Sequence, residues 1–152
     1  MSDMSVIVRC KNCLMLNRVL QSRLGSKPVC GSCKSVLEVP LAPVWAKAES
    51  FDRDIAYWPE TLLIVFTASM CLHCKIIEPL LRDLAQKRAG KLKVMKVDVE
   101  TDEYLAQRFA ITKTPTFIVY RNAAEVIRVD GAPKDKADLV TWIDNLMGFT
   151  SY

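Results

Sequence analysis

Residues 62–75, LLIVFTASMCLHCK, join a continuous apolar run to a pair of cysteines, and this stretch decides the fold. The run at 62–66 has the length and composition of a strand that is buried on both faces of a sheet. Apolar residues then recur with helical spacing from Cys71 to about residue 89. Cys71 and Cys74 therefore lie where a predicted buried strand meets the first turn of a predicted long helix.

A C-x-x-C pair can be half of a zinc site, a redox-active dithiol or a chance pairing. At a helix N-terminus, unpaired N–H groups and the helix dipole stabilise an anion such as a thiolate. We therefore expect Cys71 to have a lowered pKa and to be the nucleophile, with Cys74 as the resolving thiol. A zinc site here would need two more ligands, and the region offers only His73, which already lies inside the motif. The redox dithiol is the favoured interpretation.

Helices and strands alternate through the rest of this region. We expect strands at 43–48, 91–99, 116–120 and 125–130, the last two joined by a turn at Asn122, and helices at 51–58, 103–109 and 138–147, the first with Ser50 as its N-cap. This alternation predicts an α/β domain with a mixed central sheet flanked by helices.

Four more cysteines, Cys10, Cys13, Cys30 and Cys33, precede this domain as two C-x-x-C pairs separated by sixteen residues. The spacing is typical of zinc ribbons. A segment of about 40 residues buries too little apolar surface to fold unaided, so a metal would stabilise it. Four thiolates complete a tetrahedron and leave no position for water. We expect one structural zinc per chain; free or disulfide-bonded cysteines are the alternative.

Two prolines at positions 40 and 43 mark a connector between the two parts. We therefore predict a four-cysteine module at 1–39, a linker at 40–43 and a larger domain at 44–152. Basic residues exceed acidic ones in the first part, whereas the two signs balance in the second. Bound thiolates would reduce that excess, so we favour solubility over nucleic-acid binding as its role.

Composition and cysteine usage indicate a cytoplasmic protein. Half of the residues are hydrophobic and a quarter are charged, as in soluble globular proteins. No apolar run reaches the length of a membrane span, and the first residues lack the features of a signal peptide. Structural disulfides are rare in the cytosol, so three tight cysteine pairs suggest metal binding or catalysis.

Residues 43–147 resemble the thioredoxin family. The features that carry the resemblance are LLIVFTASMCLHCK, the helix proline Pro79, VMKVDVE at 94–100, FAITKTPTFIVYRN at 109–122, and Gly131. With its four-cysteine head, the whole chain resembles the zinc-containing second class of bacterial thioredoxins. The resemblance implies a thioredoxin fold and a protein thiol–disulfide oxidoreductase. It also implies disulfide-containing protein substrates and a reductant such as thioredoxin reductase or glutathione. We expect a monomer.

The resemblance also assigns roles to residues around the dithiol. Pro115 is implied to be a cis-proline that faces the cysteines, and Thr114 is implied to offer backbone groups to a bound substrate strand. Gly131 falls on a family position beside the same groove. Leu72 adds apolar surface next to the nucleophile, and with Met70 it is assigned to substrate binding.

The chain departs from the family pattern at several positions. The usual W-C-G-P-C-K is here M-C-L-H-C-K, and the family's buried aspartate falls on Val65. A family tryptophan falls on Thr67, whereas Lys96 keeps a family position. Loss of the acid casts doubt on fast turnover, because general-base assistance is worth about 10²–10⁴-fold. Asp130 is a candidate substitute, although a solvated carboxylate at the end of a strand is the favoured interpretation.

Histidine at position 73 resembles the C-x-H-C arrangement of disulfide oxidases and isomerases. An imidazole beside Cys71 would stabilise the thiolate and make the disulfide a stronger oxidant. We expect a cytosolic disulfide reductase with a raised redox potential. A disulfide isomerase or weak oxidase is the first alternative, and a non-enzymatic module that binds a partner or a metal cluster is the second.

Overall fold

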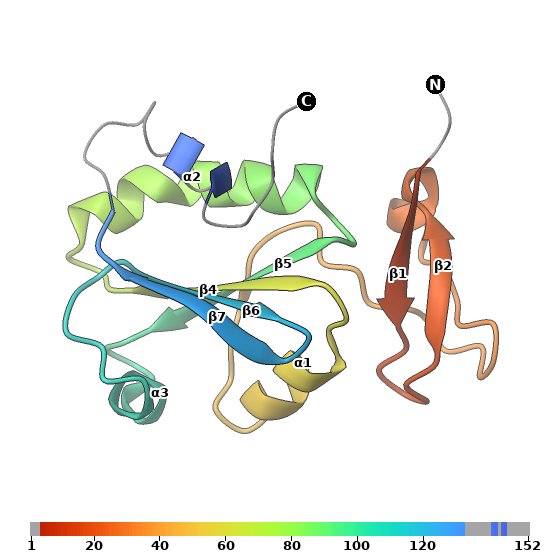
Figure 1. Ribbon diagram of the computed structural model, residues 1–152, viewed down its shortest axis with the longest axis horizontal. Helices are drawn as coiled ribbons and strands as arrows, with labels where there is room; N and C mark the ends of the chain where they lie inside the picture. Colours follow the sequence, from red (N-terminus) through yellow and green to blue (C-terminus); the bar gives the residue numbers. More distant parts are fainter. Residues whose placement is uncertain (1–3, 133–140, 143, 146–152) are drawn as a thin grey trace.

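A five-stranded mixed sheet lies at the centre of the larger part of the chain, the body (Figure 1). The structure is a computed structural model that describes residues 4–132, 141, 142, 144 and 145. The strand order is β3-β5-β4-β6-β7, with β4 parallel to β5 and antiparallel to β6. The strands are β3 (Val44–Trp45), β4 (Thr61–Thr67), β5 (Leu92–Asp98), β6 (Thr116–Arg121) and β7 (Ala124–Asp130). The prediction of an α/β fold with a mixed sheet is confirmed.

Helices cover both faces of the sheet. α2 (Leu72–Lys87) lies along one face, and α1 (Phe51–Tyr57) and α3 (Glu103–Arg108) lie on the other (Figure 1). Alternate residues of β4 belong to the two cores, with Val65 among the side chains on the α2 side and Phe66 among those on the α1 and α3 side. The apolar run 62–66 is therefore buried on both faces because β4 is the central strand.

Several predicted boundaries differ from those observed. The strand predicted at 43–48 is reduced to Val44–Trp45, the two residues that pair with β5. Ser50 is the N-cap residue of α1, as predicted, but its side chain makes no capping hydrogen bond, because its hydroxyl donates to the Asp54 carboxylate at 2.9 Å. The helix predicted at 138–147 lies mostly outside the described residues, and the four described there are helical. Within the described residues, no helix combines the length and the apolar character that a membrane span requires.

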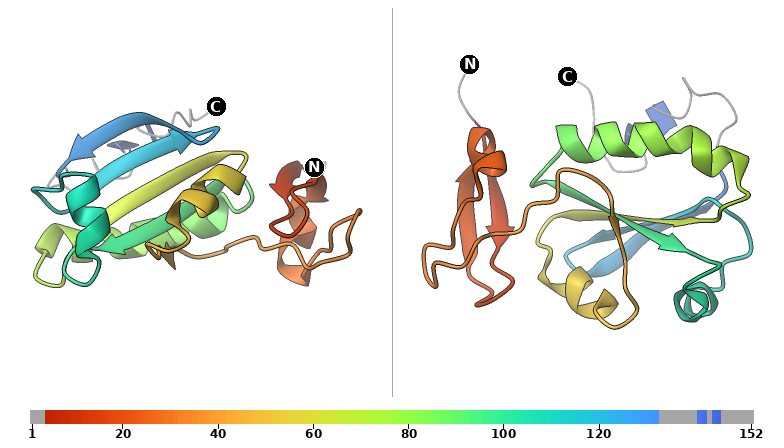
Figure 2. Two further views of the ribbon diagram at one scale, coloured as in Figure 1. Left: turned by 90° about the horizontal axis from the view of Figure 1, so that it is seen from below. Right: turned by 180° about the vertical axis from the view of Figure 1, so that it is seen from behind.

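The N-terminal part, the head, is a small separate layer beside the body (Figure 2). Two antiparallel strands, β1 (Ser5–Arg9) and β2 (Leu16–Leu20), precede a 3₁₀ helix, η1 (Gln21–Ser26). The core is built from apolar residues and two of the cysteines: Val6, Val8, Cys10, Val19, Leu24, Cys30 and Leu37. The sequence does not predict β1 and β2, because each strand has only five residues, too few for a hydrophobic period to show.

The head contacts the body through tight packing near the end of α2. Gly90 has a φ of +87°, and a Cβ at this position would lie 2.5 Å from Cγ2 of Val6 on β1. Glycine therefore meets both a backbone and a space requirement here. Elsewhere between the two parts, the Arg9 guanidinium donates hydrogen bonds to the carbonyls of Ala56 at 3.2 Å and Tyr57 at 3.3 Å.

Charged side chains add a second set of contacts between head and body. The Lys11 ammonium lies 3.4 Å from the buried Asp54 carboxylate of α1 and 3.5 Å from Glu38 of the head. In the body, Lys93 donates a hydrogen bond to the Tyr57 hydroxyl at 3.1 Å. Burial lowers the pKa of Lys93, and burial with the nearby acidic charges raises the pKa of Tyr57 to about 12.

Candidate redox and metal sites

The dithiol lies in the loop that leads from β4 into α2. Cys71 is the N-cap of α2, and the Cys74 backbone N–H donates a hydrogen bond to Cys71 Sγ at 3.1 Å. The two sulfurs are joined in a disulfide, and both residues are buried. The Cys74 N–H in the first turn thus points at the sulfur that would carry negative charge after reduction. This is the position that the sequence indicated for the nucleophile.

An apolar rim surrounds the cysteines. Met70 is 91% exposed and Leu72 is 70% exposed. His73, which lies between the two cysteines in the sequence, is less exposed than these two and is half-buried. The loop itself is held by Ser69, whose backbone N–H and hydroxyl both donate hydrogen bonds to the Glu100 carboxylate at 2.9 Å. Two exposed apolar side chains on an anchored loop offer a surface for an apolar segment of another protein.

Pro115 lies at the same edge of the sheet as the dithiol. The Thr114–Pro115 peptide bond is cis, as the resemblance to the thioredoxin family implied, and Pro115 is buried. Because Thr116 pairs with Phe66 in the antiparallel β4–β6 ladder, Pro115 lies beside the end of β4 that leads to the cysteines. The Gly131 N–H donates a hydrogen bond to the Pro115 carbonyl at 2.7 Å. The predicted site residues from β6 and β7 therefore meet at this edge.

Two charged residues that the sequence singled out, Asp130 and Lys96, both form ion pairs. Asp130 is exposed and forms an ion pair with Arg128 at 3.2 Å, which supports the interpretation as a strand-end carboxylate. Lys96 pairs in register with Val65 on β4, and its ammonium contacts the Glu78 carboxylate at 2.7 Å. Sequence reasoning missed Glu78. Its signal was the helical spacing of four residues after Cys74.

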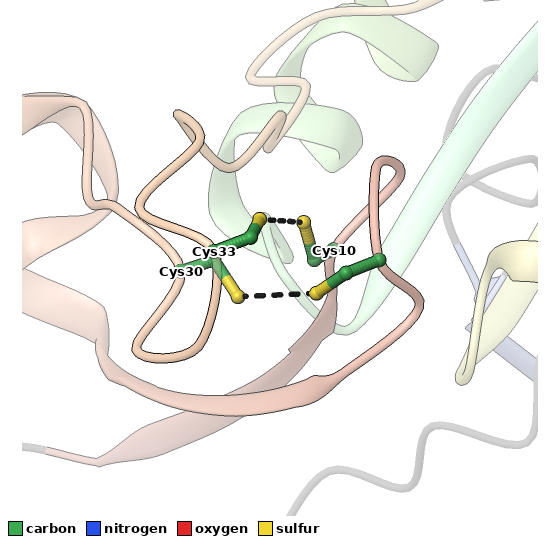
Figure 3. Close-up of side chains that lie close together, drawn as sticks. Cys10, Cys30 and Cys33 are labelled. Carbon is green, nitrogen blue, oxygen red and sulfur yellow. Dashed lines mark hydrogen bonds between the residues drawn. The ribbon is translucent and has the colours of Figure 1, made fainter.

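The four cysteines of the head converge on a second site. Their sulfurs all lie within 4.8 Å of one another, although they come from two separate turns of the chain. The sulfurs form two facing pairs, Cys10 with Cys33 at 3.5 Å and Cys13 with Cys30 at 3.6 Å. Figure 3 labels Cys10, Cys30 and Cys33 of this cluster. Sulfurs that bind one zinc at about 2.3 Å in a tetrahedron are about 3.8 Å apart. The arrangement therefore fits a four-coordinate metal ion.

Hydrogen-bond donors around two of these sulfurs, those of Cys30 and Cys33, favour thiolates. The Asn12 amide donates to Cys33 Sγ at 3.5 Å, and with a contact to the Ser35 hydroxyl it lowers the pKa of Cys33 to about 5. The pKa of Cys30 is lowered as well, first by the backbone N–H of Cys33. Metal ions bind the thiolate form, so these donors suit a metal site.

A buried central strand that leads into a cysteine pair at a helix N-terminus defines a thiol–disulfide oxidoreductase, here with an added four-cysteine module. The family model described as thioredoxin matches residues 42–145, and the model described as the N-terminal domain of thioredoxin 2 matches residues 9–35. The chain belongs to the thioredoxin family.

Known proteins resemble the chain over most of its length. Thioredoxin C-3 of Corynebacterium nephridii is 30% identical over 139 residues, which cover 91% of this chain and 94% of that protein. A thioredoxin of Mycobacterium tuberculosis strain H37Rv is 34% identical over 98 residues, or 64% of this chain and 84% of that protein. Among solved structures, the N21Q mutant thioredoxin of Halobacterium salinarum shares the fold with a TM-score of 0.60. Its sequence identity is 23%, and the match covers 75% of this chain and 98% of that one.

Proposed function

We propose that the protein reduces disulfide bonds in other proteins, with Cys71 as the attacking thiol and Cys74 as the resolving thiol. The observation that carries this assignment is the 3.1 Å hydrogen bond from the Cys74 N–H to Cys71 Sγ, because it stabilises negative charge on that sulfur. The Cys71 thiolate attacks a substrate disulfide, forms a mixed disulfide and releases one substrate thiolate. Cys74 then attacks Cys71 Sγ, so the internal disulfide forms and the second substrate thiol leaves.

Substrate binding in this proposal uses the surface around the cysteines. Met70 and Leu72 are exposed on the loop and would contact apolar side chains of the substrate. Thr114, next to the buried Pro115, would offer backbone groups to an extended substrate strand, as in β-strand addition. Gly131 lacks a side chain beside this strand and would leave space for the substrate backbone.

His73 gives the active site a more oxidising character in this proposal. Its imidazole follows Cys71 by two residues, so its dipole or charge would stabilise the thiolate and thus the reduced form. We expect a redox potential above the value of about −270 mV that is typical of thioredoxin. The same feature supports a second candidate function, disulfide isomerisation or weak oxidation, since both require a less reducing pair.

For the head, we propose one structural zinc ion held by Cys10, Cys13, Cys30 and Cys33. The four sulfurs fit a tetrahedron that leaves no open position, so the ion would hold the two turns together and take no part in the reaction. The head would otherwise depend on a very small apolar core. Zinc analysis of the purified protein should give about one ion per chain.

We further propose a cytosolic monomer that is recycled by a reductase such as thioredoxin reductase with NADPH, or by glutathione. The four cysteines of the head are free thiols, which suits a reducing compartment. Turnover of a disulfide substrate with thioredoxin reductase and NADPH, and separately with glutathione, distinguishes the two reductants. Stronger recycling by glutathione, together with refolding of scrambled disulfides, would favour the isomerase function.

The assignment of the two thiols is tested by trapping. Cys74→Ser should accumulate mixed disulfides with client proteins in cell extract, because the resolving thiol is missing. Cys71→Ser should accumulate far fewer, and both variants should lose insulin reduction in dithiothreitol. The wild-type protein is the control and should trap almost no clients, because Cys74 resolves each mixed disulfide. A Cys71→Ser variant that traps more clients than Cys74→Ser would reverse the assignment.

A further inference from the structure

A half-buried ion pair lies beside the strand position where the acid is missing. Lys96 pairs in register with Val65 of β4 and with Trp45 of β3, so the three side chains lie on the same face of the sheet. The Lys96 side chain is only 11% exposed, and its ammonium lies 4.2 Å from the centre of the Trp45 ring. The same ammonium donates a hydrogen bond to Glu78 Oε1 at 2.7 Å. An acid is therefore present on this face, supplied by α2 instead of β4.

Glu78 is placed one helical turn beyond the resolving cysteine. Residues four apart on a helix are neighbours on one face, so Glu78 follows Cys74 along the same side of α2. Its Oε1 faces Lys96 from β5 at 2.7 Å and Arg82 from α2 at 3.9 Å, and these are the charged groups that contact it among the described residues. Its Oε2 has no hydrogen-bond donor among the residues that the structure describes and is available to a water molecule.

We propose that Glu78 is the proton acceptor for Cys74, acting through one water molecule, and that Lys96 and Trp45 position it. The proposal rests on the proposed function, because it concerns the step in which Cys74 resolves the mixed disulfide. Cys74 is 5% exposed, so its thiol has little access to bulk water as an acceptor. A general base can act across a single water. Glu78 thus supplies from the helix the acid–base group that Val65 cannot supply from the strand.

The proton and electron balance of this step is complete. The Cys74 S–H proton moves through water to the Glu78 carboxylate. The Cys74 thiolate attacks Cys71 Sγ, so the bond between Cys71 and the substrate sulfur breaks as the internal disulfide forms. The electron pair leaves with the substrate sulfur, which takes up the proton from Glu78. The dithiol loses two electrons, and the substrate disulfide gains them.

Single-turnover reaction with an aromatic disulfide, 5,5′-dithiobis(2-nitrobenzoate), separates this step from the first attack. Reduced protein should release one coloured thiolate when Cys71 attacks and a second when Cys74 resolves. The leaving group needs no proton, so the second phase measures deprotonation of Cys74. Glu78→Gln should slow the second phase by about 100-fold near pH 7 and leave the first phase unchanged. The deficit should shrink above about pH 9, where the thiol ionises into water unaided.

Two variants separate a proton-transfer role from a structural one. Asp83→Asn removes a carboxylate that pairs with Lys87 on the same helix at 3.0 Å, and it should leave both phases unchanged. Glu78→Asp keeps the acid, so it should restore most of the rate that Glu78→Gln loses. Glu78→Ala also lacks the carboxylate and replaces Glu78→Gln if that variant does not fold. A second phase that matches the wild type from pH 6 to 9 in the variant without the carboxylate would overturn the proposal. Absence of the first phase in the wild type would instead overturn the proposed function.

Discussion

The head and the body use the same C-x-x-C motif in opposite settings. In the head, each pair faces a second pair within 4.8 Å, and side-chain and backbone donors surround the sulfurs. In the body, the pair stands alone at the N-terminus of a 16-residue helix, and the Cys74 backbone N–H donates a hydrogen bond to Cys71 Sγ. The first setting fits a closed tetrahedron around a metal ion, whereas in our proposal the second leaves the Cys71 thiolate to attack a substrate.

The comparison shows that the chemistry of a cysteine pair depends on which group stabilises the negative charge of its thiolates, a metal ion or a helix N-terminus. A metal ion shared by four thiolates removes their nucleophilic capacity and holds the chain. A helix terminus stabilises a single thiolate without covering it, which preserves its ability to attack a disulfide. The two-residue spacing within a single C-x-x-C pair does not separate the two cases. The presence of a second pair at zinc-ribbon spacing does.

The largest expected effect comes from removing one cysteine at each site in turn and measuring both activity and bound zinc. Cys71→Ser should reduce insulin reduction by at least about 10³-fold, because removal of a nucleophile costs several powers of ten. The same variant should retain its zinc. Cys30→Ala should lose the zinc and keep activity within a few-fold of the wild type, because no ligand of the head takes part in the redox step. Metal analysis and insulin turbidity on the same samples give both quantities.

Retention of zinc by Cys30→Ala would contradict the four-thiolate site. Loss of activity in that variant would contradict the separation of roles, provided that far-UV circular dichroism shows a folded body. Cys13→Ser serves as the second head variant, because Cys13 is exposed and its sulfur pairs with Cys30 at 3.6 Å.

The next effect concerns the contact between the two parts. Gly90→Ala should destabilise the protein by roughly 2–3 kcal/mol, from a left-handed backbone that disfavours alanine and from a Cβ that would meet Val6 at 2.5 Å. The redox potential of the dithiol should stay the same. Chemical denaturation followed by circular dichroism measures the change in the free energy of unfolding.

A double variant separates the two causes. Adding Val6→Ala to Gly90→Ala should remove the steric part, so the two changes together should cost less than their sum. Additive costs would mean that the head does not rest on Gly90 as described. A shifted potential in Gly90→Ala would mean that the two cysteine sites are not independent.

The smallest effect concerns the tuning of the dithiol. His73→Pro should raise the Cys71 pKa by one or two units and lower the redox potential by roughly 30 mV for each unit, which corresponds to about 1.4 kcal/mol. Equilibration with glutathione, with both forms separated after alkylation, gives the potential. Leu72→Gly is the matched control, because it changes the other residue between the cysteines and leaves the imidazole. A wild-type value at or below about −270 mV, or no shift in His73→Pro, would contradict the role of His73.

Features that depend on local sequence could be predicted, and those that depend on strand register could not. The run at 62–66 and the start of α2 at Leu72 follow from hydrophobic spacing, and the zinc-type cluster follows from cysteine spacing. The pair between Glu78 and Lys96 requires knowing that α2 crosses β5 at that residue. Likewise, β1 has only five residues, which is too short for its hydrophobic period to show in the sequence.

Lys11 lies between two of the proposed zinc ligands, Cys10 and Cys13, and its ammonium reaches Asp54 on α1. Because Lys11 connects the proposed metal site to the body, an ion that binds the head would stabilise the folded state of the whole chain. A ligand that binds only the folded state adds about 2.7 kcal/mol of stability at a free concentration of 100 times its dissociation constant. The body would share in that gain through the contacts of Lys11. The cellular supply of metal would thus help to set how much folded oxidoreductase is present, although the ion never meets a substrate.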